Sequence, residues 1–292
     1  MKARAIILVT YFGKWPDYFD LYLYSCSKNP IVDFYYFTDC PIPEIIYANT
    51  YFISIPFSDY CKNVSIALDI DFRPSNAYKL ADLKPFLAII HADIINKYDF
   101  WGFGDIDLIY GRLSDILTTK NLNHYTAFST HTNKISGHFC LLSRNKFKEV
   151  GFKIKDWQQM LEDETSYVLD ENYLARIVYP DMRYRRGIKK ILRMNHLCTI
   201  LDMPRWLQWL TKKFQLECFT TSIPTKDSLY IYKDGEIIDM QTNKKLIYIH
   251  FIFFKGSPHY NLTHKWGDNY YQCTALDFGR EISIDWDFIK LK

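Results

Sequence analysis

The sequence predicts an α/β fold, in which an open sheet is flanked by helices on both faces. Short runs of β-branched and aromatic residues alternate with stretches of helical length through the first half of the chain, which is typical of a doubly wound sheet. Hydrophobic residues make up 48% and charged residues 24% of the 292 residues. A chain of this length and composition can bury a large core, and global disorder is excluded.

Charge and cysteine content narrow the class of protein. The net charge of +3 argues against a protein that mainly coats nucleic acid, so we expect no nucleic-acid partner. The seven cysteines are scattered without CxxC spacing, as expected of reduced thiols in the cytoplasm. No apolar run reaches the length of a membrane span, and the run at 5–9 is too short for a signal peptide.

The first elements follow from these patterns in order. The continuous β-branched run at 5–9 predicts a strand that is buried on both faces. Further strands are expected at 34–37 and 51–55, and helices at 18–27 and 59–68. Thr10 and Tyr11 follow the first strand and Asp39 follows the second. The carboxyl ends of parallel strands are where open α/β sheets bind their ligands.

The segment YDFWGFGDIDLIYG carries the strongest signal of chemistry. It places Asp105 and Asp107 one residue apart at the end of an apolar run that contains Trp101 and Phe103. Residues i and i+2 of a strand point to the same side, so both carboxylates can face one divalent cation, Mn²⁺ or Mg²⁺. The alternative is a surface turn that carries two acids. We favour the metal site, because burying two uncompensated carboxylates beside aromatic residues is costly.

Just upstream, the block YKLADLKP at 78–85 predicts the start of a long helix that continues to about residue 95. Pro85 is tolerated only in the first turn of a helix, so Lys79, Asp82 and Lys84 are expected at or before its start. Such residues can hold phosphate and ribose hydroxyls. An ordinary solvated helix start explains them equally well.

Two more candidate positions follow. Strands are expected at 127–129 and 139–142, and Gly137-His138 interrupts the apolar pattern before the second of them, which suggests close approach of a ligand. A helix is expected at 171–178 with Asp170 as its N-cap. Capping would explain Asp170 but not Glu171.

The second half of the chain is less regular. Residues 183–214 mix basic residues with leucines and tryptophans, which fits either a helix at a membrane interface or a helical subdomain packed on the core. A hairpin is expected at 228–240 with Asp234-Gly235 in its turn. A last strand at 246–254 carries His250 and is followed by Lys255; a histidine in a strand is more often a core residue than a ligand. Residues 259–292 give no assignable pattern.

Taken together, the blocks YKLADLKP, WGFGDIDLIYG, SGHFCLL, LDENYLA and IHFIFFKG, in this order, resemble nucleotide-sugar-dependent glycosyltransferases of the GT-A fold. With the N-terminal TYFGKWPDYFDLYLYSC, the sequence is more closely similar to a bacterial polysaccharide-biosynthesis family. The resemblance covers residues 5–180 well and the region of His250 more loosely. It implies a Rossmann-like mixed sheet flanked by helices. The domains would be a nucleotide-sugar-binding core at 1–180, a helical insertion at 181–220, and a C-terminal hairpin and strand at 221–292 that complete the active site.

The resemblance also implies roles for individual residues. By this resemblance, the nucleoside would lie against Thr10, Tyr11 and Asp39, and the ribose or diphosphate would lie near Lys79 and Asp82. The metal and nucleotide would be held by Asp105 and Asp107, with His250 as the third protein ligand, and the departing diphosphate would be neutralised by Lys255. The donor sugar would be bordered by Gly137 and His138, and the place of the catalytic acid or base would be taken by the Asp170–Glu171 pair.

We therefore expect a metal-dependent glycosyltransferase that uses a nucleotide diphosphate sugar, with a UDP-sugar favoured. Its acceptor would be a glycan or lipid-linked oligosaccharide in the synthesis of a bacterial surface polysaccharide such as capsule or O-antigen. Contact with the inner face of the cytoplasmic membrane would involve residues 183–214. Two alternatives are a sugar nucleotidyltransferase and a non-catalytic module that binds a nucleotide sugar or glycan. The first would be expected to carry a glycine-rich, basic phosphate loop, which TYFGKWPDYF lacks.

Overall fold

A computed structural model describes residues 4–130, 135–178, 213–215, 224–255 and 265–292. Within these residues the core is a seven-stranded sheet with the order β3-β2-β1-β4-β7-β6-β8. Strands β1 to β4 run parallel, whereas β7 is antiparallel to both β4 and β6. The predicted α/β fold with a mixed sheet is confirmed. The strands are β1 Ala5–Thr10, β2 Val32–Thr38, β3 Thr50–Ser54, β4 Phe100–Gly104, β6 Ala127–Ser129, β7 Phe139–Ser143 and β8 Lys213–Gln215.

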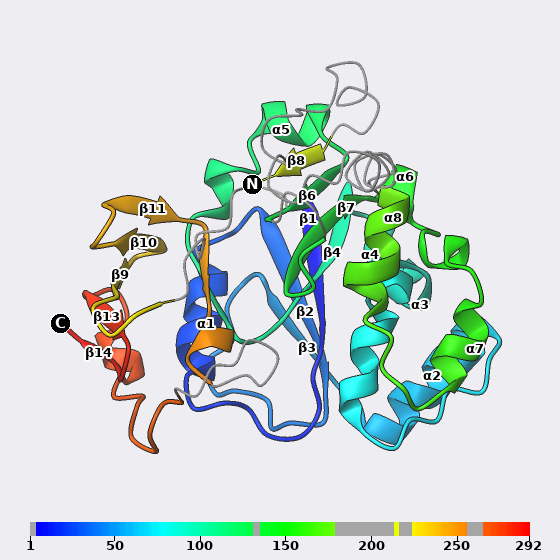
Figure 1. Cartoon of the computed structure of the whole chain (residues 1–292), viewed down its shortest axis with the longest axis horizontal. Helices are drawn as coiled ribbons and strands as arrows, with labels where there is room; N and C mark the ends of the chain where they lie inside the picture. Colours follow the sequence, from blue (N-terminus) through cyan, green and yellow to red (C-terminus); the bar gives the residue numbers. More distant parts are fainter. Residues whose placement is uncertain (1–3, 131–134, 179–212, 216–223, 256–264) are drawn as a thin grey trace, which may run out of the picture.

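Two layers cover the two faces of this sheet (Figure 1). Alternation along β1 shows the division, because Ile7 and Val9 belong to one core cluster while Ile6 and Leu8 belong to the other, as the two-residue period of a strand requires. The first cluster includes α1 and the second includes α2 and α3. The helices are α1 Phe19–Ser27, α2 Phe57–Leu68, α3 Leu87–Ile90, α4 Ala92–Ile95, α5 Thr119–His124, α6 Arg144–Phe147, α7 Trp157–Glu162 and α8 Ala175–Val178.

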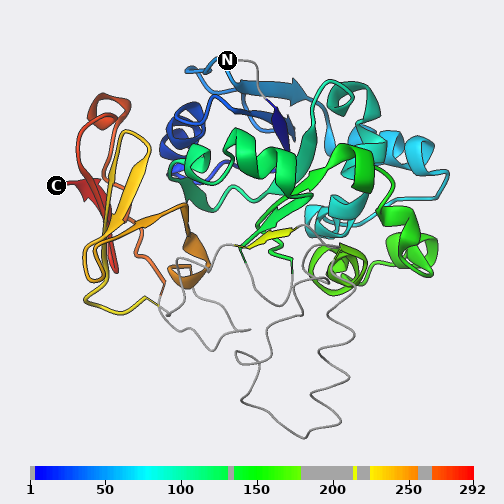
Figure 2. The same cartoon turned by 90° about the horizontal axis from the view of Figure 1, so that it is seen from above.

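A second, antiparallel sheet lies beside α1, and it includes the C-terminal residues that gave no sequence signal (Figures 1 and 2). Tyr24 of α1 stacks on Phe278 with ring centroids 4.9 Å apart and meets Tyr232 edge-on. The predicted hairpin is confirmed: Asp234 and Gly235 both have positive φ, at 47° and 81°, as a two-residue hairpin turn requires. The strands of this second sheet, in spatial order, are β11 Lys244–Leu246, β10 Glu236–Asp239, β9 Leu229–Lys233, β13 Ile282–Asp285 and β14 Ile289–Leu291.

The acidic pair does not lie in a strand, contrary to prediction. β4 ends at Gly104, and Asp105 to Asp107 form a bend before β5 Leu108–Tyr110. The chain bends here because β5 leaves the main sheet and pairs antiparallel with β12 Tyr248–His250. The predicted strand at 246–254 is divided accordingly into the end of β11, the short β12 and a 3-10 helix at Phe251–Phe253.

Two helix predictions also need correction. The segment expected as one long helix begins with a 3-10 helix, Ala77–Phe86 (η1), and continues as the short α3 and α4, with a break at His91. The His91 ring is held there by the hydroxyl of Tyr60 at 3.0 Å and by stacking on Phe37. Asp170 is not an N-cap, because it lies inside a π-helical turn, Asp170–Leu174 (η4), for which Leu169 is the cap.

Little of the predicted insertion at 181–220 falls within the described residues. The described part, Lys213–Gln215, is a strand parallel to β6 and not a helix. The basic segment 183–214 otherwise lies outside the described residues. Among the residues that are described, no helix is both long and apolar enough to cross a lipid bilayer.

The closeness of β4 and β7 gives a test of the central sheet. A Cβ on Gly102 would lie 1.9 Å from the carbonyl oxygen of Cys140, so Gly102→Ala must push the two strands apart. We expect a loss of about 1–3 kcal/mol in the free energy of unfolding, measured by urea denaturation. Gly267→Ala is the matched control, because a Cβ there meets nothing within 4 Å. Equal stability of the two variants would contradict the strand packing described here.

Candidate active site

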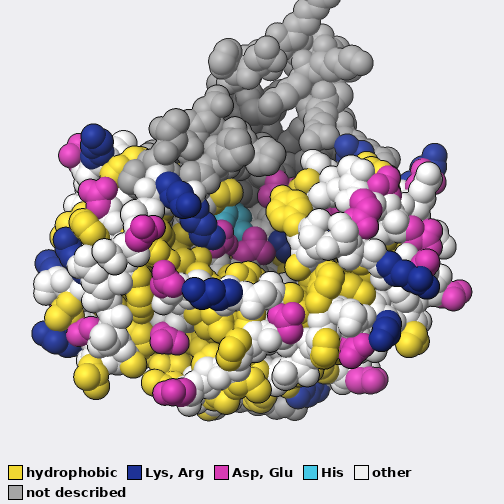
Figure 3. All heavy atoms as spheres, turned by 90° about the horizontal axis from the view of Figure 1, so that it is seen from below, with side chains coloured by type: hydrophobic (Ala, Val, Ile, Leu, Met, Phe, Trp, Pro, Cys, Tyr) yellow, Lys and Arg dark blue, Asp and Glu magenta, His cyan; other side chains and the backbone are white. Residues whose placement is uncertain are grey.

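A cavity of about 1120 Å³ opens at the carboxyl edge of β1 and β4. Figure 3 shows the hollow from this side, with histidine and acidic side chains on its floor. Its walls come from β1, η1, the bend after β4, the segment before β7, the start of η4, and the chain that follows β12. The residues with functional groups that line it include Thr10, Tyr11, Tyr18, Tyr78, Lys84, Asp105, Asp107, His138, Asp170, Glu171, His250, Lys255 and Lys265.

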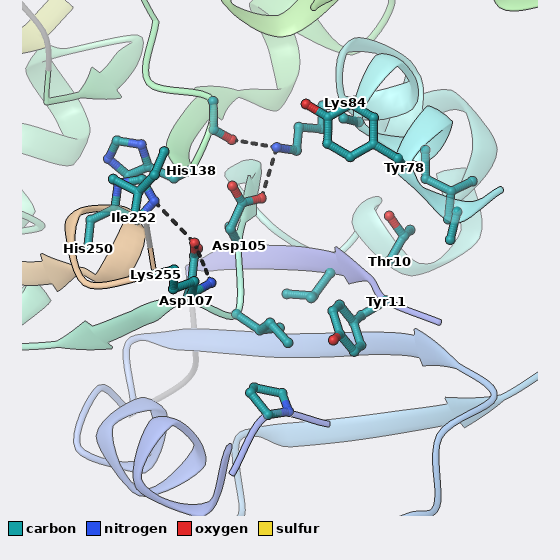
Figure 4. Close-up of a pocket in the computed structure, with 18 of the residues that line it drawn as sticks. Thr10, Tyr11, Tyr78, Lys84, Asp105, Asp107, His138, His250, Ile252 and Lys255 are labelled. Carbon is teal, nitrogen blue, oxygen red and sulfur yellow. Dashed lines mark hydrogen bonds and ion pairs between the residues drawn. The ribbon is translucent and has the colours of Figure 1, made fainter. Parts of the chain in front are cut away.

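Asp107 is the centre of one charged cluster. Its Oδ2 lies 2.9 Å from Nζ of Lys255 and 3.4 Å from Nε2 of His250 (Figure 4). The main chain is fixed as well, because the amide of Phe251 donates to the Asp107 carbonyl at 2.8 Å. Burial alone would raise the pKa of Asp107, but His250 and Lys255 outweigh it and hold this pKa well below its ordinary value. Asp107 is therefore a carboxylate anion at neutral pH.

The other oxygen of Asp107 is unusual. Oδ1 is buried and has no hydrogen-bond partner among the described residues. A buried carboxylate oxygen without a donor or cation is costly. Its position at the cavity therefore marks a place where a bound cation or hydrogen-bond donor would be stabilised.

Lys84 is the centre of a second cluster across the cavity (Figure 4). Its Nζ donates to Oδ1 of Asp105 at 2.8 Å and to the Gly137 carbonyl at 2.8 Å, and lies 3.4 Å from Oδ2 of Asp170. Burial alone would lower the pKa of Lys84, but Asp105 and Asp170 more than offset it and raise that pKa above its ordinary value. One permanent ammonium thus holds three segments of the wall together.

The backbone at Gly137 lies close to the carboxylates of Asp170 and Glu171. A Cβ at this position would lie 2.8 Å from Oδ2 of Asp170 and 3.0 Å from Oε1 of Glu171. Its own amide donates to Oε1 of Glu171 at 3.3 Å. A larger residue here would have to displace the Asp170 carboxylate, so the glycine lets both acids approach the backbone, as the interruption of the apolar pattern in the sequence suggested.

His138 is held by two neighbours. Its Nε2 lies 2.8 Å from the hydroxyl of Tyr248, and its ring stacks on His250 with centroids 4.0 Å apart. The Tyr248 hydroxyl bonds in turn to Thr130, which meets Ser136 at 2.5 Å. This buried hydroxyl network ties the end of β6 to β12 and holds the His138 ring, which stacks on His250 beside Asp107.

The structure brings some predicted site residues together and separates others. Thr10, Tyr11, Asp105, Asp107, Gly137, His138, Asp170, Glu171, His250 and Lys255 all line the cavity. Asp39 does not line it; its Oδ1 instead accepts from the amide of Gly13 at 2.8 Å. Lys79 and Asp82 do not reach it either, because both are buried and bonded to each other at 3.0 Å. The expectation that these two contact a ribose or diphosphate is therefore not supported by their placement.

The expected three-ligand metal set is also not assembled. Asp105 turns to Lys84 whereas Asp107 turns to His250 and Lys255. Among the described residues, no group of three or more histidine, cysteine or acidic side chains gathers closely enough to hold a metal ion. The bend at Ile106, which replaces the expected strand, is why the two carboxylates diverge.

Lys84 is a residue of the cavity to which the resemblance assigned no role, although the YKLADLKP block placed it with Lys79 and Asp82 among residues that can hold phosphate and ribose hydroxyls. In a 3-10 helix residues i and i+3 lie on the same face. Lys79 and Asp82 therefore share a face, and it is the buried one, while Lys84 lies on another that meets the cavity.

The buried carboxyl of Asp170 gives a pH test of this geometry. Burial raises its pKa; Lys84 opposes this, while Asp105 and Glu171 add to it. The ionised form is thus disfavoured in the fold, and wild-type protein loses stability as pH rises from its ordinary pKa through the raised one. Asp170→Asn lacks this loss, so its stability relative to wild type should increase from pH 4 to pH 7, measured by urea denaturation. A stability of Asp170→Asn relative to wild type that falls between pH 4 and pH 7 would contradict the assignment.

The chain is similar in structure to two glycosyltransferases, with low identity and low TM-scores. The galactosyltransferase LgtC in complex with donor and acceptor sugar analogs is 11% identical, with a TM-score of 0.36 over 76% of this chain and 90% of that one. The glycosyltransferase GlyE of Streptococcus pneumoniae TIGR4 is 13% identical, with a TM-score of 0.27 over 74% of this chain and 46% of that one. No curated protein matches the sequence. A family model described as a family of unknown function, DUF6625, matches residues 7–279, and the chain belongs to this family.

Proposed function

We propose that this protein is a metal-dependent glycosyltransferase that moves a sugar from a nucleotide diphosphate sugar, with a UDP-sugar favoured, to a hydroxyl acceptor. The observation that carries the proposal is the pairing of two charged clusters across one cavity. On one side Asp107, His250 and Lys255 offer a carboxylate, an imidazole and an ammonium. On the other side a pair of acids, Asp170 and Glu171, lies at the cavity wall.

The residues present fit a divalent cation at Asp107. The partnerless Oδ1 is a hard oxygen ligand of the kind that Mg²⁺ and Mn²⁺ prefer, and the His250 imidazole lies beside the same carboxylate. We propose that Asp107 and His250 would hold Mn²⁺ or Mg²⁺, with Asp105 beside them on the same bend. When bound, the ion would supply positive charge to a diphosphate.

Lys255 suits the departing diphosphate. Its side chain is 41% exposed and its ammonium lies at the cavity, 2.9 Å from Asp107. As the bond between the anomeric carbon and the diphosphate oxygen breaks, negative charge grows on that oxygen, and a fixed ammonium stabilises it. The nucleoside would lie by Thr10 and Tyr11 at the end of β1, where the Tyr11 ring is backed by Trp15, stacked at 5.2 Å.

The acid pair suits the acceptor. A hydroxyl must lose its proton as its oxygen bonds to the anomeric carbon, and Asp170 or Glu171 would accept that proton if configuration is inverted. If configuration is retained, the same carboxylates would orient the donor sugar. Gly137 and His138 would border that sugar, because they lie between the two clusters.

The acceptor is proposed from the sequence resemblance alone. It would be a glycan or a lipid-linked oligosaccharide in the synthesis of a bacterial surface polysaccharide, such as capsule or O-antigen. Any contact with the membrane would involve residues 183–214, which lie outside the described residues.

A thermal-shift panel of nucleotide diphosphates and their sugars, with and without Mn²⁺, tests the donor site. A ligand at about 100 times its dissociation constant should add roughly 2.7 kcal/mol of stability. We expect a Mn²⁺-dependent shift with one nucleotide family. Asp107→Asn should weaken the affinity for Mn²⁺ by about tenfold or more and so reduce the shift, because one ligand oxygen and its charge are lost.

Asp239→Asn is the control, because it makes the same substitution at a carboxylate of the second sheet that does not line the cavity. It should leave the shift unchanged. A shift that survives Asp107→Asn in a folded protein would remove Asp107 from the metal site. No shift with any nucleotide would favour a non-catalytic sugar-binding module.

A further inference from the structure

The backbone is strained immediately before the two acids of the cavity. Val168 has φ of 54°, a left-handed conformation that is a clear outlier for a β-branched residue. It lines the cavity and is 38% exposed, so its side chain gains little from packing there. Two residues later the chain enters the π-helical turn that begins with Asp170 and Glu171. Such strain persists only where surrounding contacts enforce it, and it concentrates at functional sites.

Asp82 supplies that enforcement by bonding to the residues on either side of Val168. Its Oδ2 accepts from the amide of Tyr167 at 2.9 Å, and its Oδ1 accepts from the amide of Leu169 at 3.1 Å. One carboxylate therefore fixes the backbone amides of both residues next to the strained Val168. Asp82 is fully buried, so no water competes for these bonds.

Lys79 completes the arrangement. Its ammonium donates to Oδ2 of Asp82 at 3.0 Å, to the Met160 carbonyl at 2.7 Å and to the Thr165 carbonyl at 2.5 Å. All three N–H groups of the ammonium are thus used, which is what makes a buried lysine tolerable. Both side chains bond to the same segment of the chain, because the backbone groups that they contact all lie between residues 160 and 169.

We propose that Lys79 and Asp82 are positioning residues that hold the backbone at 167–169 in its strained form and thereby present Asp170 and Glu171 to the cavity. The role of those two acids rests on the proposed function, but the clamp itself does not. η1 then contacts this segment at two places. Asp82 fixes the backbone before Asp170, and Nζ of Lys84 lies 3.4 Å from the Asp170 carboxylate.

A simpler alternative is that the pair only stabilises the fold. A clamp and a pair that only stabilises the fold predict different effects of substitutions at Val168. If the clamp opposes strain at Val168, then a residue that accepts positive φ removes the need for it. If the pair only stabilises the fold, substitutions at 82 and 168 should act independently.

The test follows amide hydrogen exchange at 167–171 by mass spectrometry in four proteins: wild type, Asp82→Asn, Val168→Gly and the double variant. Asp82→Asn keeps the size of the side chain but leaves one amide facing an NH₂ group. We expect exchange at 167–171 to rise at least tenfold in Asp82→Asn and to recover by at least half, on a logarithmic scale, in the double variant. Glycine provides this recovery because it has no Cβ to disfavour positive φ.

Two controls separate strain from trivial effects. Val168→Ala combined with Asp82→Asn should give no comparable recovery, because alanine keeps the Cβ. Asp285→Asn is the matched carboxylate control: Asp285 also accepts two amides, of Asp287 at 2.9 Å and Phe288 at 2.7 Å, and lies near Lys290. It should not change exchange at 167–171.

Unchanged exchange in folded Asp82→Asn, or strictly additive effects of the two substitutions, would overturn the proposal. If Asp82→Asn does not fold, the single variants still decide the matter, because Val168→Gly should melt at a higher temperature than Val168→Ala; the reverse order would refute the strain.

Turnover is measured alongside as Mn²⁺-dependent hydrolysis of UDP-glucose. Slower hydrolysis in Asp82→Asn that the double variant restores would support the link to the acids. Hydrolysis that is unchanged while exchange rises would refute that link. If wild type hydrolyses nothing, the donor proposal fails for this sugar, while the exchange data still test the clamp.

Discussion

The ammonium of Lys84 is the group on which the cavity depends. It is the common partner of the bend after β4, the strand end before β7 and the π-helical turn that carries Asp170. Each of these segments ends in a carboxylate or carbonyl oxygen that faces the cavity, and without a cation they would repel one another. The side chain of Lys84 is 13% exposed, so the attraction acts in a medium that screens it weakly. The wall is therefore built around one positive charge.

The charged side chains around the cavity form two groups. Lys84 contacts Asp105 and Asp170, and Lys255 and His250 contact Asp107. The first group is closed, because its ammonium already bonds three oxygens. The second is open, because Oδ1 of Asp107 has no partner among the described residues. The two groups therefore differ in function. The closed group holds the segments of the wall together, and the open group is where a bound cation or donor would be stabilised most.

The sequence predicted those parts of the fold that local residues determine. The buried run of β1 and the Asp234-Gly235 turn depend on side chains within a few positions, and both predictions are confirmed. The bend at Asp105 could not be predicted, because it depends on the pairing of β5 with β12, which is far along the chain. The roles of Lys79 and Lys84 could not be distinguished either, because the sequence does not indicate which face of η1 is buried and which meets the cavity. In the site, residue types were predictable but their grouping was not.

The pairing of β5 with β12 also bears on how the protein is made. β1 to β4 and β7 belong to the first half of the chain, so the central sheet can begin to form while synthesis continues. His250 and Lys255 arrive more than a hundred residues after the Asp107 that they neutralise. Until β12 docks, that carboxylate has neither of its partners, and its pKa is free of their influence. The cavity can therefore be completed only after residues 248–255 have been synthesised, and a nascent chain that lacks them would carry the acidic bend without its basic partners.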